Sequence, residues 1–312
     1  MEDLLGKQVV KELVFAAVAS FLIFQLSLFF YLFTIPVFYM GRKYGWHTSL
    51  VLAAVLLAAV TVQLVVKMRG FEDSQLKGFI VIYGLSYPVM LLAGTAVVTV
   101  FSGRSLYKML AATALFAAAG IPAILIFSGN DHVVSFLKEQ IAYVTGIILG
   151  NESSLASMDL KSSDLMNMVK VIAFRDFIAA YFYLLAGCWY LSDLFFAKRQ
   201  KTGGFSFENF DFPDWFVWIL IVSLSGVLAD HLFTLGWAGY ISWNAALIMM
   251  LMYGIKGVGL ISFLLKKYNV TKQKRRSLIM ILFILFLIPG LNLVVLLGIP
   301  GFGISEIWVR YR

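Results

Sequence analysis

Long runs of apolar residues, each about 20 residues in length, recur along the chain. A helix of this length crosses a hydrocarbon core of about 30 Å. The apolar blocks are Leu13–Met40, Ser49–Val66, Phe79–Val100, Met109–Phe127, Val169–Ala197, Trp215–Leu232, Trp243–Leu265 and Leu278–Leu297. None of them alternates apolar and polar residues as a membrane β-strand does. The pattern predicts an all-α fold, a polytopic transmembrane helical bundle.

The first block, Leu13–Met40, is too long for one simple span, because a helix over its whole length would reach about 42 Å. Two interpretations stay open. One strongly tilted helix gives about eight spans. A full helix followed by a short returning helix gives about nine, with a turn near Phe30-Tyr31 or Pro36. Pro88, Pro122 and Pro289 mark further kinks or breaks, which membrane helices tolerate.

Composition supports the membrane assignment. Hydrophobic residues make up 61% of the chain and charged residues 13%, whereas a soluble domain is roughly half apolar and a quarter charged. This excludes a soluble enzyme, a disordered protein and a fibrous repeat. With the single Cys188 and three histidines that lie far apart in sequence, no disulfide framework or cysteine metal site is expected.

The charged residues indicate an orientation. The chain has 25 basic and 17 acidic residues, and in a membrane protein the positive-inside rule explains this surplus better than nucleic-acid binding. Basic residues follow every second block, most densely in the 266–277 loop, which we expect to be cytoplasmic. Lys67, Arg69 and Lys77 fall on the opposite side. We expect one membrane domain, 1–312, in a bacterial inner membrane.

The longest connection, 128–168, is net acidic and is expected to be extracytoplasmic. Its first half, Val133 to Leu149, is compatible with an amphipathic helix at the membrane interface. Its second half is serine-rich and typical of a loop. It is either a plain connector or a lid over an extracytoplasmic opening.

Ionisable residues inside apolar blocks are costly and therefore mark functional candidates. Arg175 and Asp176 lie near the start of one block. Lys256 lies near the middle of Trp243–Leu265, where a lysine costs about 2.5–3.5 kcal/mol on the insertion scale. Together with Asn244 they form the candidate ligand-binding set for a charged or zwitterionic small molecule. The alternatives are that Lys256 pairs internally with Asp176 or Asp230, while Asn244 joins helices, or that the charges reach the interface.

Small residues at helical spacing mark candidate helix contacts. Ala16 and Ser20 form one such pair, and Gly254 and Gly257 flank Lys256. Small side chains let helix backbones approach closely in membranes. Packing within the chain is the simplest interpretation of each.

Enzymatic signatures are missing from the sequence. It has no phosphate-binding Gly-x-x-x-x-Gly-Lys motif, no His-Glu-x-x-His and no Gly-x-Ser-x-Gly elbow. We therefore expect no catalytic residues, no cofactor and no bound metal.

Four segments of the C-terminal third carry a family resemblance. They are Asp211-Phe-Pro-Asp-Trp, Trp243-Asn-Ala-Ala-Leu, Tyr253-Gly-Ile-Lys-Gly and Gly303-Ile-Ser-Glu-Ile-Trp-Val-Arg-Tyr-Arg312. They resemble the YybS-like family of uncharacterised bacterial integral membrane proteins. Gly303, Trp308 and Arg312 match that family's closing motif, where Glu306 and Arg310 replace its two acids. Lys256 stands where the family usually has Gln.

That family is in turn similar to the substrate-binding membrane subunits of energy-coupling-factor vitamin transporters. The resemblance favours splitting the first block into two helices, and implies that Ala16 and Ser20 would dock on an energising membrane subunit. It implies a protein that binds or helps to move a small molecule with partner ATPases. The rival hypothesis is a scaffold for other envelope proteins, with its charges paired internally. Membrane lipid is a partner in both cases, and nucleic acid in neither.

Overall fold

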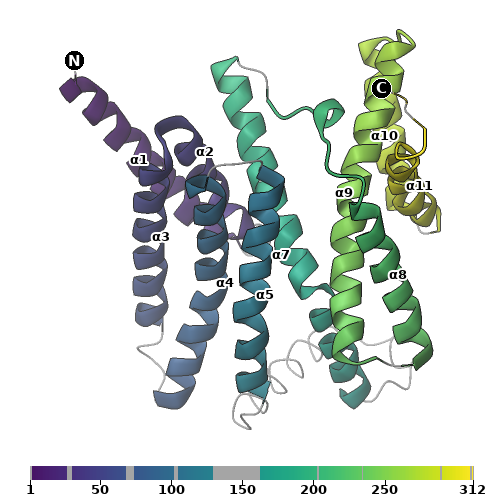
Figure 1. Ribbon diagram of the computed structural model, residues 1–312. Helices are drawn as coiled ribbons and strands as arrows, with labels where there is room; N and C mark the ends of the chain where they lie inside the picture. The colour runs from purple at the N-terminus through teal and green to yellow at the C-terminus, as the bar shows by residue number, and fades with distance from the viewer. Residues whose placement is uncertain are drawn as a thin grey trace, which may run out of the picture. The chain divides into compact units, whose positions relative to one another are not determined.

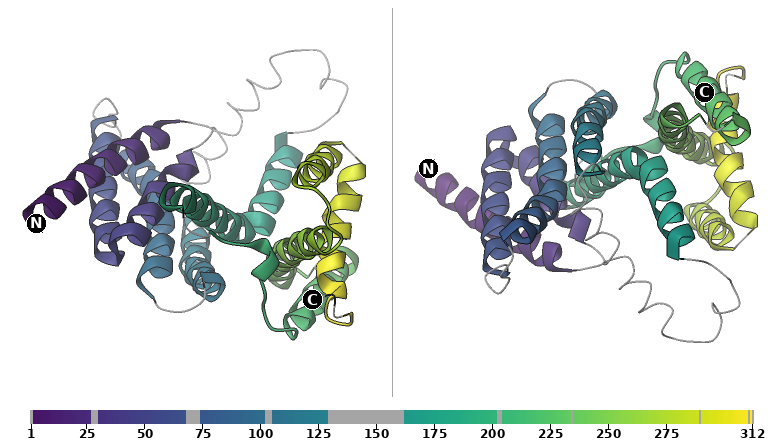
Figure 2. Two further views of the ribbon diagram at one scale, coloured as in Figure 1. Left: turned by 90° about the horizontal axis from the view of Figure 1, so that it is seen from above. Right: turned by 90° about the horizontal axis from the view of Figure 1, so that it is seen from below.

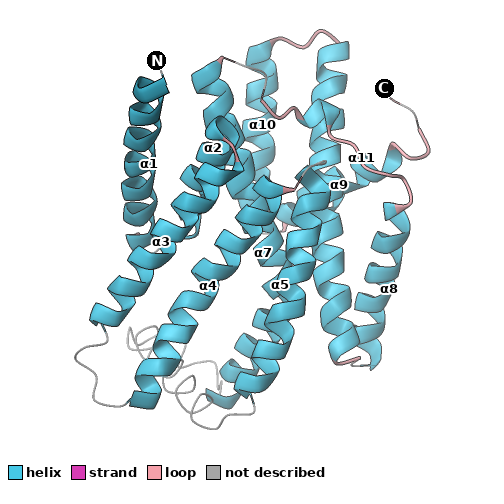
Figure 3. Cartoon of the chain, turned by 60° about the vertical axis from the view of Figure 1, so that its left-hand side comes forward, coloured by secondary structure: helices cyan, strands magenta, loops and turns pink. Residues whose placement is uncertain are grey.

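The fold is entirely helical wherever the structure describes it. The computed structural model describes residues 2–26, 30–67, 74–101, 105–128, 162–201, 204–233, 235–288, 290–309 and 311. Over these ranges the backbone forms helices, turns and loops, and no strand occurs (Figure 3). The predicted all-α class is therefore confirmed. The expected interfacial helix Val133–Leu149 lies outside the described residues.

The chain divides into two compact units. Unit 1 consists of Met1–Phe174 and Ala180–Thr202, and unit 2 consists of Arg175–Ala179 and Gly203–Arg312. Helix α7 (Ser162–Gln200) contributes to both units, because its short stretch Arg175–Ala179 belongs to unit 2.

Unit 1 begins with a helix that ends well before the first apolar block does. Helix α1 covers Glu2–Gln25, a 3-10 helix η1 covers Phe30–Thr34, and α2 covers Ile35–Tyr44. Pro36 lies in the first turn of α2. Proline is well tolerated there, because amides of the first turn have no hydrogen-bond partner within the helix. The structure therefore has the split form of the first block.

Three further helices of unit 1 lie side by side in chain order (Figures 1 and 2). They are α3 (Trp46–Lys67), α4 (Ser74–Val100) and α5 (Ser105–Ser128), and α1 packs on α3.

Tyr181 of α7 shows why the sequence needs a glycine in α4. Its ring stacks on Phe116 at 3.9 Å, and its hydroxyl donates to the Met90 carbonyl at 2.9 Å. A Cβ at Gly94 would collide with that hydroxyl.

Unit 2 is built around one long helix. It contains the 3-10 helix η3 (Phe207–Asn209), α8 (Phe216–Phe233), α9 (Trp237–Lys267), α10 (Lys272–Leu287) and α11 (Leu291–Ser305). Both α8 and α11 pack on α9 (Figure 1). The last apolar block, Leu278–Leu297, is thus two helices rather than one, and the break falls between Leu287 and Leu291, where Gly290 has a φ of 89°.

Glycines of α9 and α11 bring backbones into direct contact. A Cβ on Gly257 would collide with the Ile299 carbonyl, and one on Gly303 with the Tyr253 carbonyl. A Cβ on Gly259 would collide with the Phe207 carbonyl of the segment before α8. Close approach of this kind is a normal basis of helix packing in membranes.

Five helices of the described part are long and apolar enough to cross a membrane. These segments are Gly6–Gln25, Trp46–Lys67, Arg175–Gln200, Phe216–Phe233 and Trp237–Lys267. Shorter apolar helices occur at Gly84–Val100, Ser105–Ala119 and Leu291–Ser305. The structure thus supports a multi-pass membrane protein, and the expected total of about eight or nine spans stays a prediction.

Candidate functional site: a lysine and three carboxylates beside helix α9

Lys256 of α9 lies among three carboxylates. Its Nζ is 3.2 Å from Asp211 Oδ1, 4.0 Å from Asp214 Oδ1 and 3.9 Å from Glu306 Oε2. We call these four residues the lysine cluster. The lysine side chain is buried, with 4% exposed, whereas those of Asp211 and Asp214 are each 72% exposed. The cluster therefore has a buried cation and an open acidic rim.

Three of the four segments that carry the family resemblance meet here. Asp211 and Asp214 come from the segment before α8, Lys256 from the glycine-rich part of α9, and Glu306 from the residue that follows α11. Residues far apart in the sequence thus form one site. The close contact of Gly257 and Gly303 between α9 and α11 is what allows Glu306 to approach Lys256.

The pairing of α8 with α9 sets the depth of the cluster. Ser242 of α9 lies against Gly226 of α8, and Asp230 of α8 lies against Gly239 of α9. This antiparallel register brings Lys256 level with the start of α8. Because the 18 residues of α8 span about 27 Å, close to the hydrocarbon thickness, we expect Lys256 to lie near the membrane boundary. The mid-membrane position expected from the apolar block does not take into account that α9 begins six residues before Trp243, at Trp237.

Aromatic rings line the acidic segment. Phe212 packs edge-on against Tyr253 at 4.9 Å, and the Lys256 ammonium lies 5.2 Å from the centre of the Phe212 ring. Phe205, Phe207, Phe210 and Phe216 continue the row of ring contacts on the same segment. Ring faces attract cations, so carboxylates and rings together favour a positively charged group.

Arg175 belongs to a second group of residues, near the other end of α9. Its Nη2 lies 3.5 Å from Asp230 Oδ2, and its guanidinium carbon lies 5.1 Å from the centre of the Trp243 ring. Asp230 Oδ1 also accepts a hydrogen bond from the Leu235 amide at 2.9 Å. The arginine is thus tied to the turn between α8 and α9.

Asn244 holds α7 within unit 2. Its Oδ1 accepts hydrogen bonds from the backbone amides of Ile178 and Ala179, both at 2.9 Å, and its Nδ2 donates to the Tyr240 carbonyl at 2.8 Å. Amides inside a helix normally donate to carbonyls four residues earlier. Here the Ile178 and Ala179 amides also donate to a side chain of α9, while α7 continues as one uninterrupted helix.

The four predicted ligand-binding residues therefore fall into two groups. Arg175 and Asn244 lie near one end of α9, whereas Lys256 is twelve residues beyond Asn244, about 18 Å along the helix. Asp176 is exposed. Within the described residues, the acids near Lys256 are Asp211, Asp214 and Glu306 rather than the expected Asp176 or Asp230. The structure does not bring all four predicted residues together in one pocket.

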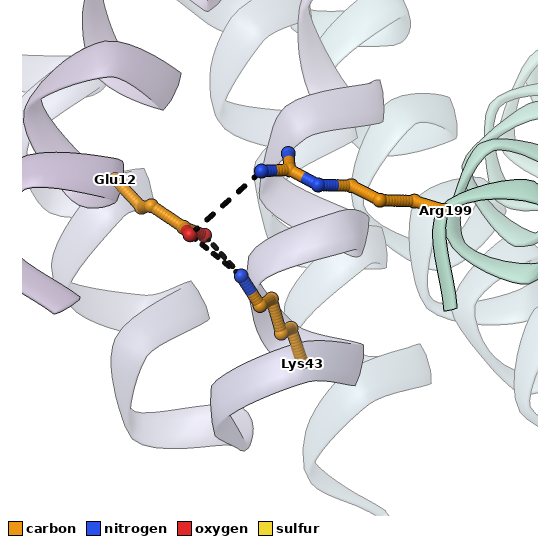
Figure 4. Close-up of polar contacts among 3 residues, drawn as sticks. All are labelled: Glu12, Lys43 and Arg199. Atoms are coloured by element: carbon orange, nitrogen blue, oxygen red, sulfur yellow. Dashed lines mark hydrogen bonds and ion pairs between the residues drawn. The ribbon is translucent and has the colours of Figure 1, made fainter. Parts of the chain in front are cut away.

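Unit 1 contains a further charged group that the sequence analysis missed. Glu12 of α1 accepts two hydrogen bonds from Lys43 Nζ, at 2.7 and 2.5 Å, and its Oε1 lies 4.0 Å from Arg199 Nη2 (Figure 4). We call these three residues the Glu12 network. Burial lowers the pKa of Lys43, but the hydrogen bonds to Glu12 and Tyr44 and the charge of Glu12 outweigh it and raise that pKa. Next to the network, Arg42 pairs with Asp193.

The small residues proposed as helix contacts lie inside the units. Ala16 and Ser20 are buried in unit 1, where α1 contacts η1, α2 and α3. Gly257 faces Ile299 of α11, and Gly254 meets Pro300 at the ordinary distance of 3.8 Å. The face of α1 that contains Ala16 and Ser20 is thus covered by the chain itself.

One signal in the sequence pointed to part of the lysine cluster. Asp211 and Asp214 flank Pro213 just before an apolar block, and acids at the entry to a span are natural partners for a lysine near its boundary. Asp193 lies inside the apolar block Val169–Ala197, a signal that could have found it, whereas Glu12 lies beside Lys11 just before the first block and gave none. Within the described residues, no three His, Cys, Asp or Glu side chains gather as a metal site would require.

Comparison with known proteins identifies one family. A family model with the description "Predicted membrane protein (DUF2232)" matches residues 13–300, a range that includes Lys256, Asp211 and Asp214. No curated protein and no solved structure matches the chain.

Proposed function

Because this chain belongs to the DUF2232 family of predicted membrane proteins, we propose that it binds a small charged molecule at the lysine cluster and helps to move it across the membrane. The proposed setting is the inner membrane of a bacterium. The chain would be the membrane-embedded binding subunit of a transporter, and partner ATPases would supply the energy.

The charge balance of the lysine cluster carries this proposal. One buried ammonium faces three carboxylates, and two of these are largely open. A purely structural pair would need a single carboxylate to compensate the lysine. The exposed carboxylates of Asp211 and Asp214, beside the rings of Phe212 and Tyr253, suit a ligand with an ammonium group, as in an amine or a zwitterion.

Thermal unfolding of the purified protein in nanodiscs tests the proposal. The probes are putrescine, glycine betaine and succinate, which are a diammonium, a zwitterion and a dianion. We expect putrescine or betaine to raise the melting temperature, because a ligand that binds the folded state stabilises it. Succinate should not. Equal effects of all three probes, or no effect of any, would contradict the proposal.

Paired variants locate the binding. The double substitution Asp211→Asn and Asp214→Asn removes two charged acceptors and should weaken the affinity for the responsive probe by about tenfold or more. Asp176→Asn, an exposed carboxylate of unit 2, is the matched control and should bind normally. Equal weakening in both variants would assign the effect to general surface charge.

A scaffold is the second candidate, and pairing of charges within the chain supports it. Arg42 pairs with Asp193, Lys43 with Glu12 and Arg175 with Asp230, so these residues satisfy one another without a ligand. Gentle extraction of the tagged protein, followed by mass spectrometry, separates the two functions. A co-purified ATPase pair with a shared membrane subunit favours transport, whereas envelope proteins without ATPases favour the scaffold.

A further inference from the structure

The Glu12 network in unit 1 has more positive than negative charge. One carboxylate, that of Glu12, serves both Lys43 and Arg199. The nearby Arg42 and Asp193 compensate each other. The three residues of the network therefore hold one cationic charge that no carboxylate among them balances.

Arg199 has the donors to use that charge. Its side chain is 64% exposed, and its closest atom to Glu12 is 4.0 Å away, which is too long for a hydrogen bond. Figure 4 shows one terminal nitrogen of the guanidinium directed at Glu12 and the other directed away from it. A guanidinium has five N–H donors in a planar fork that matches phosphate oxygens.

A buried hydroxyl lies beside these cations. Within the described residues, the Tyr39 Oη atom is buried and has no hydrogen-bond partner. The guanidinium carbon of Arg199 is 6.0 Å from the centre of the Tyr39 ring, and Tyr39 acts electrostatically on Lys43. A buried polar group without a partner calls for a physical explanation, and a binding site for an ion is one of the usual ones. A phenol hydroxyl donates well to an anion.

The two cations of the Glu12 network also lie at the ends of their helices. Arg199 is next to last in the candidate span Arg175–Gln200, and Lys43 is next to last in α2. In a membrane these ends reach the layer of lipid headgroups that flanks the hydrocarbon core. Phosphate groups are concentrated in that layer.

We propose that the Glu12 network, with Tyr39, binds the phosphate group of an anionic ligand. Arg199 and Lys43 provide the positive charge, the Tyr39 hydroxyl donates a hydrogen bond, and Glu12 holds the two cations in place from the opposite side. Binding requires the exposed Arg199 side chain to swing off the Tyr39 ring. The same chemistry fits the headgroup of an anionic phospholipid and inorganic phosphate.

Native mass spectrometry of the full chain, after removal of its native lipid, tests this inference. The chain is mixed with phosphatidylglycerol, with phosphatidylcholine or with inorganic phosphate, and bound molecules per chain are counted. We expect retention of phosphatidylglycerol or phosphate, and no retention of phosphatidylcholine above the background of nonspecific lipid. If the chain retains phosphatidylglycerol but not inorganic phosphate, the site recognises a lipid headgroup. If it retains both, the site recognises the phosphate group itself.

Two variants and a control locate the site. Arg199→Gln should weaken retention about fivefold, from the contribution of one basic residue near a charged membrane surface. Tyr39→Phe removes only the hydroxyl and should weaken retention while the chain stays folded. Lys198→Gln makes the same change of charge one residue away and should leave retention unchanged. Equal losses in Lys198→Gln and Arg199→Gln, or equal retention of both lipids, would overturn the inference.

Discussion

At the scale of single residues, Asn244 links two helices through one amide group. Its side-chain oxygen accepts hydrogen bonds from two backbone amides of α7, and its side-chain nitrogen donates to the Tyr240 carbonyl of α9. Asn244 itself is only 3% exposed. Removal of this side chain leaves several buried polar groups without partners. Such groups are expensive, because water cannot replace the lost hydrogen bonds.

We predict that Asn244→Ala lowers the free energy of unfolding by about 1–3 kcal/mol, the cost of a buried donor without a partner. Denaturation in mixed micelles measures this. Asn209→Ala, at an exposed position of η3, serves as the control and should change stability little. If the two variants unfolded alike, the hydrogen bonds to α7 would contribute nothing to stability.

Sequence reasoning found part of the residue-scale chemistry. It singled out Lys256, Arg175 and Asn244, because polar groups inside apolar blocks stand out. It did not find that the partners of Lys256 are Asp211, Asp214 and Glu306. Each of these acids lies at least 42 residues from the lysine in sequence. Only the packing of α8 and α11 on α9 brings them close to it.

At the scale of elements, the glycine contact between α9 and α11 positions Glu306. A Cβ on Gly303 would meet the Tyr253 carbonyl and the Gly257 amide, which are backbone atoms that cannot rotate away. Gly301, two residues earlier on α11, has nothing within 4 Å of an added Cβ. The two glycines are therefore a natural pair for comparison.

We predict that Gly303→Ala destabilises the protein by about 1–3 kcal/mol, the typical cost of overpacking. Gly301→Ala should be neutral or stabilising by up to about 1 kcal/mol, because alanine favours helix. Thermal unfolding of both variants under the same conditions makes the comparison. A similar loss of stability in the two would show that α11 does not pack on α9 through Gly303.

Apolar blocks predicted the helices well, and the exceptions have local causes. Ser49–Val66 became α3, Trp46–Lys67, with its ends only a few residues away. Leu278–Leu297 became two helices, since Pro289 cannot continue the hydrogen-bonding of a helix and Gly290 adopts a positive φ. Hydrophobicity alone cannot show such a break, because both halves are apolar.

At the scale of the whole molecule, α9 is long and apolar enough to cross a membrane, so we expect its two ends to lie on opposite sides. Leu235 is exposed just before its start and Tyr268 is exposed just after its end. By the positive-inside rule we expect the end with Lys266 and Lys267 to be cytoplasmic. Cys188 is buried, so an introduced cysteine can be labelled without interference from it.

We predict that a membrane-impermeant maleimide labels Leu235→Cys in intact cells, and labels Tyr268→Cys only after the cells are permeabilised. The wild-type chain, with its buried Cys188, is the control and should remain unlabelled. The opposite pattern would reverse the orientation, and labelling of both sites in intact cells would argue against α9 as a span.

The shortness of α8 also makes the lysine cluster sensitive to bilayer thickness. At 18 residues, the helix matches a thin hydrocarbon layer, and a thicker one creates a hydrophobic mismatch at its ends. Asp214 lies two residues before α8, and α9 packs closely on α8 at Gly226 and Gly239, so tilting one helix displaces the other. A thicker bilayer must therefore thin around the hairpin or cover the acidic rim with acyl chains, so that lipid composition would control access to Lys256.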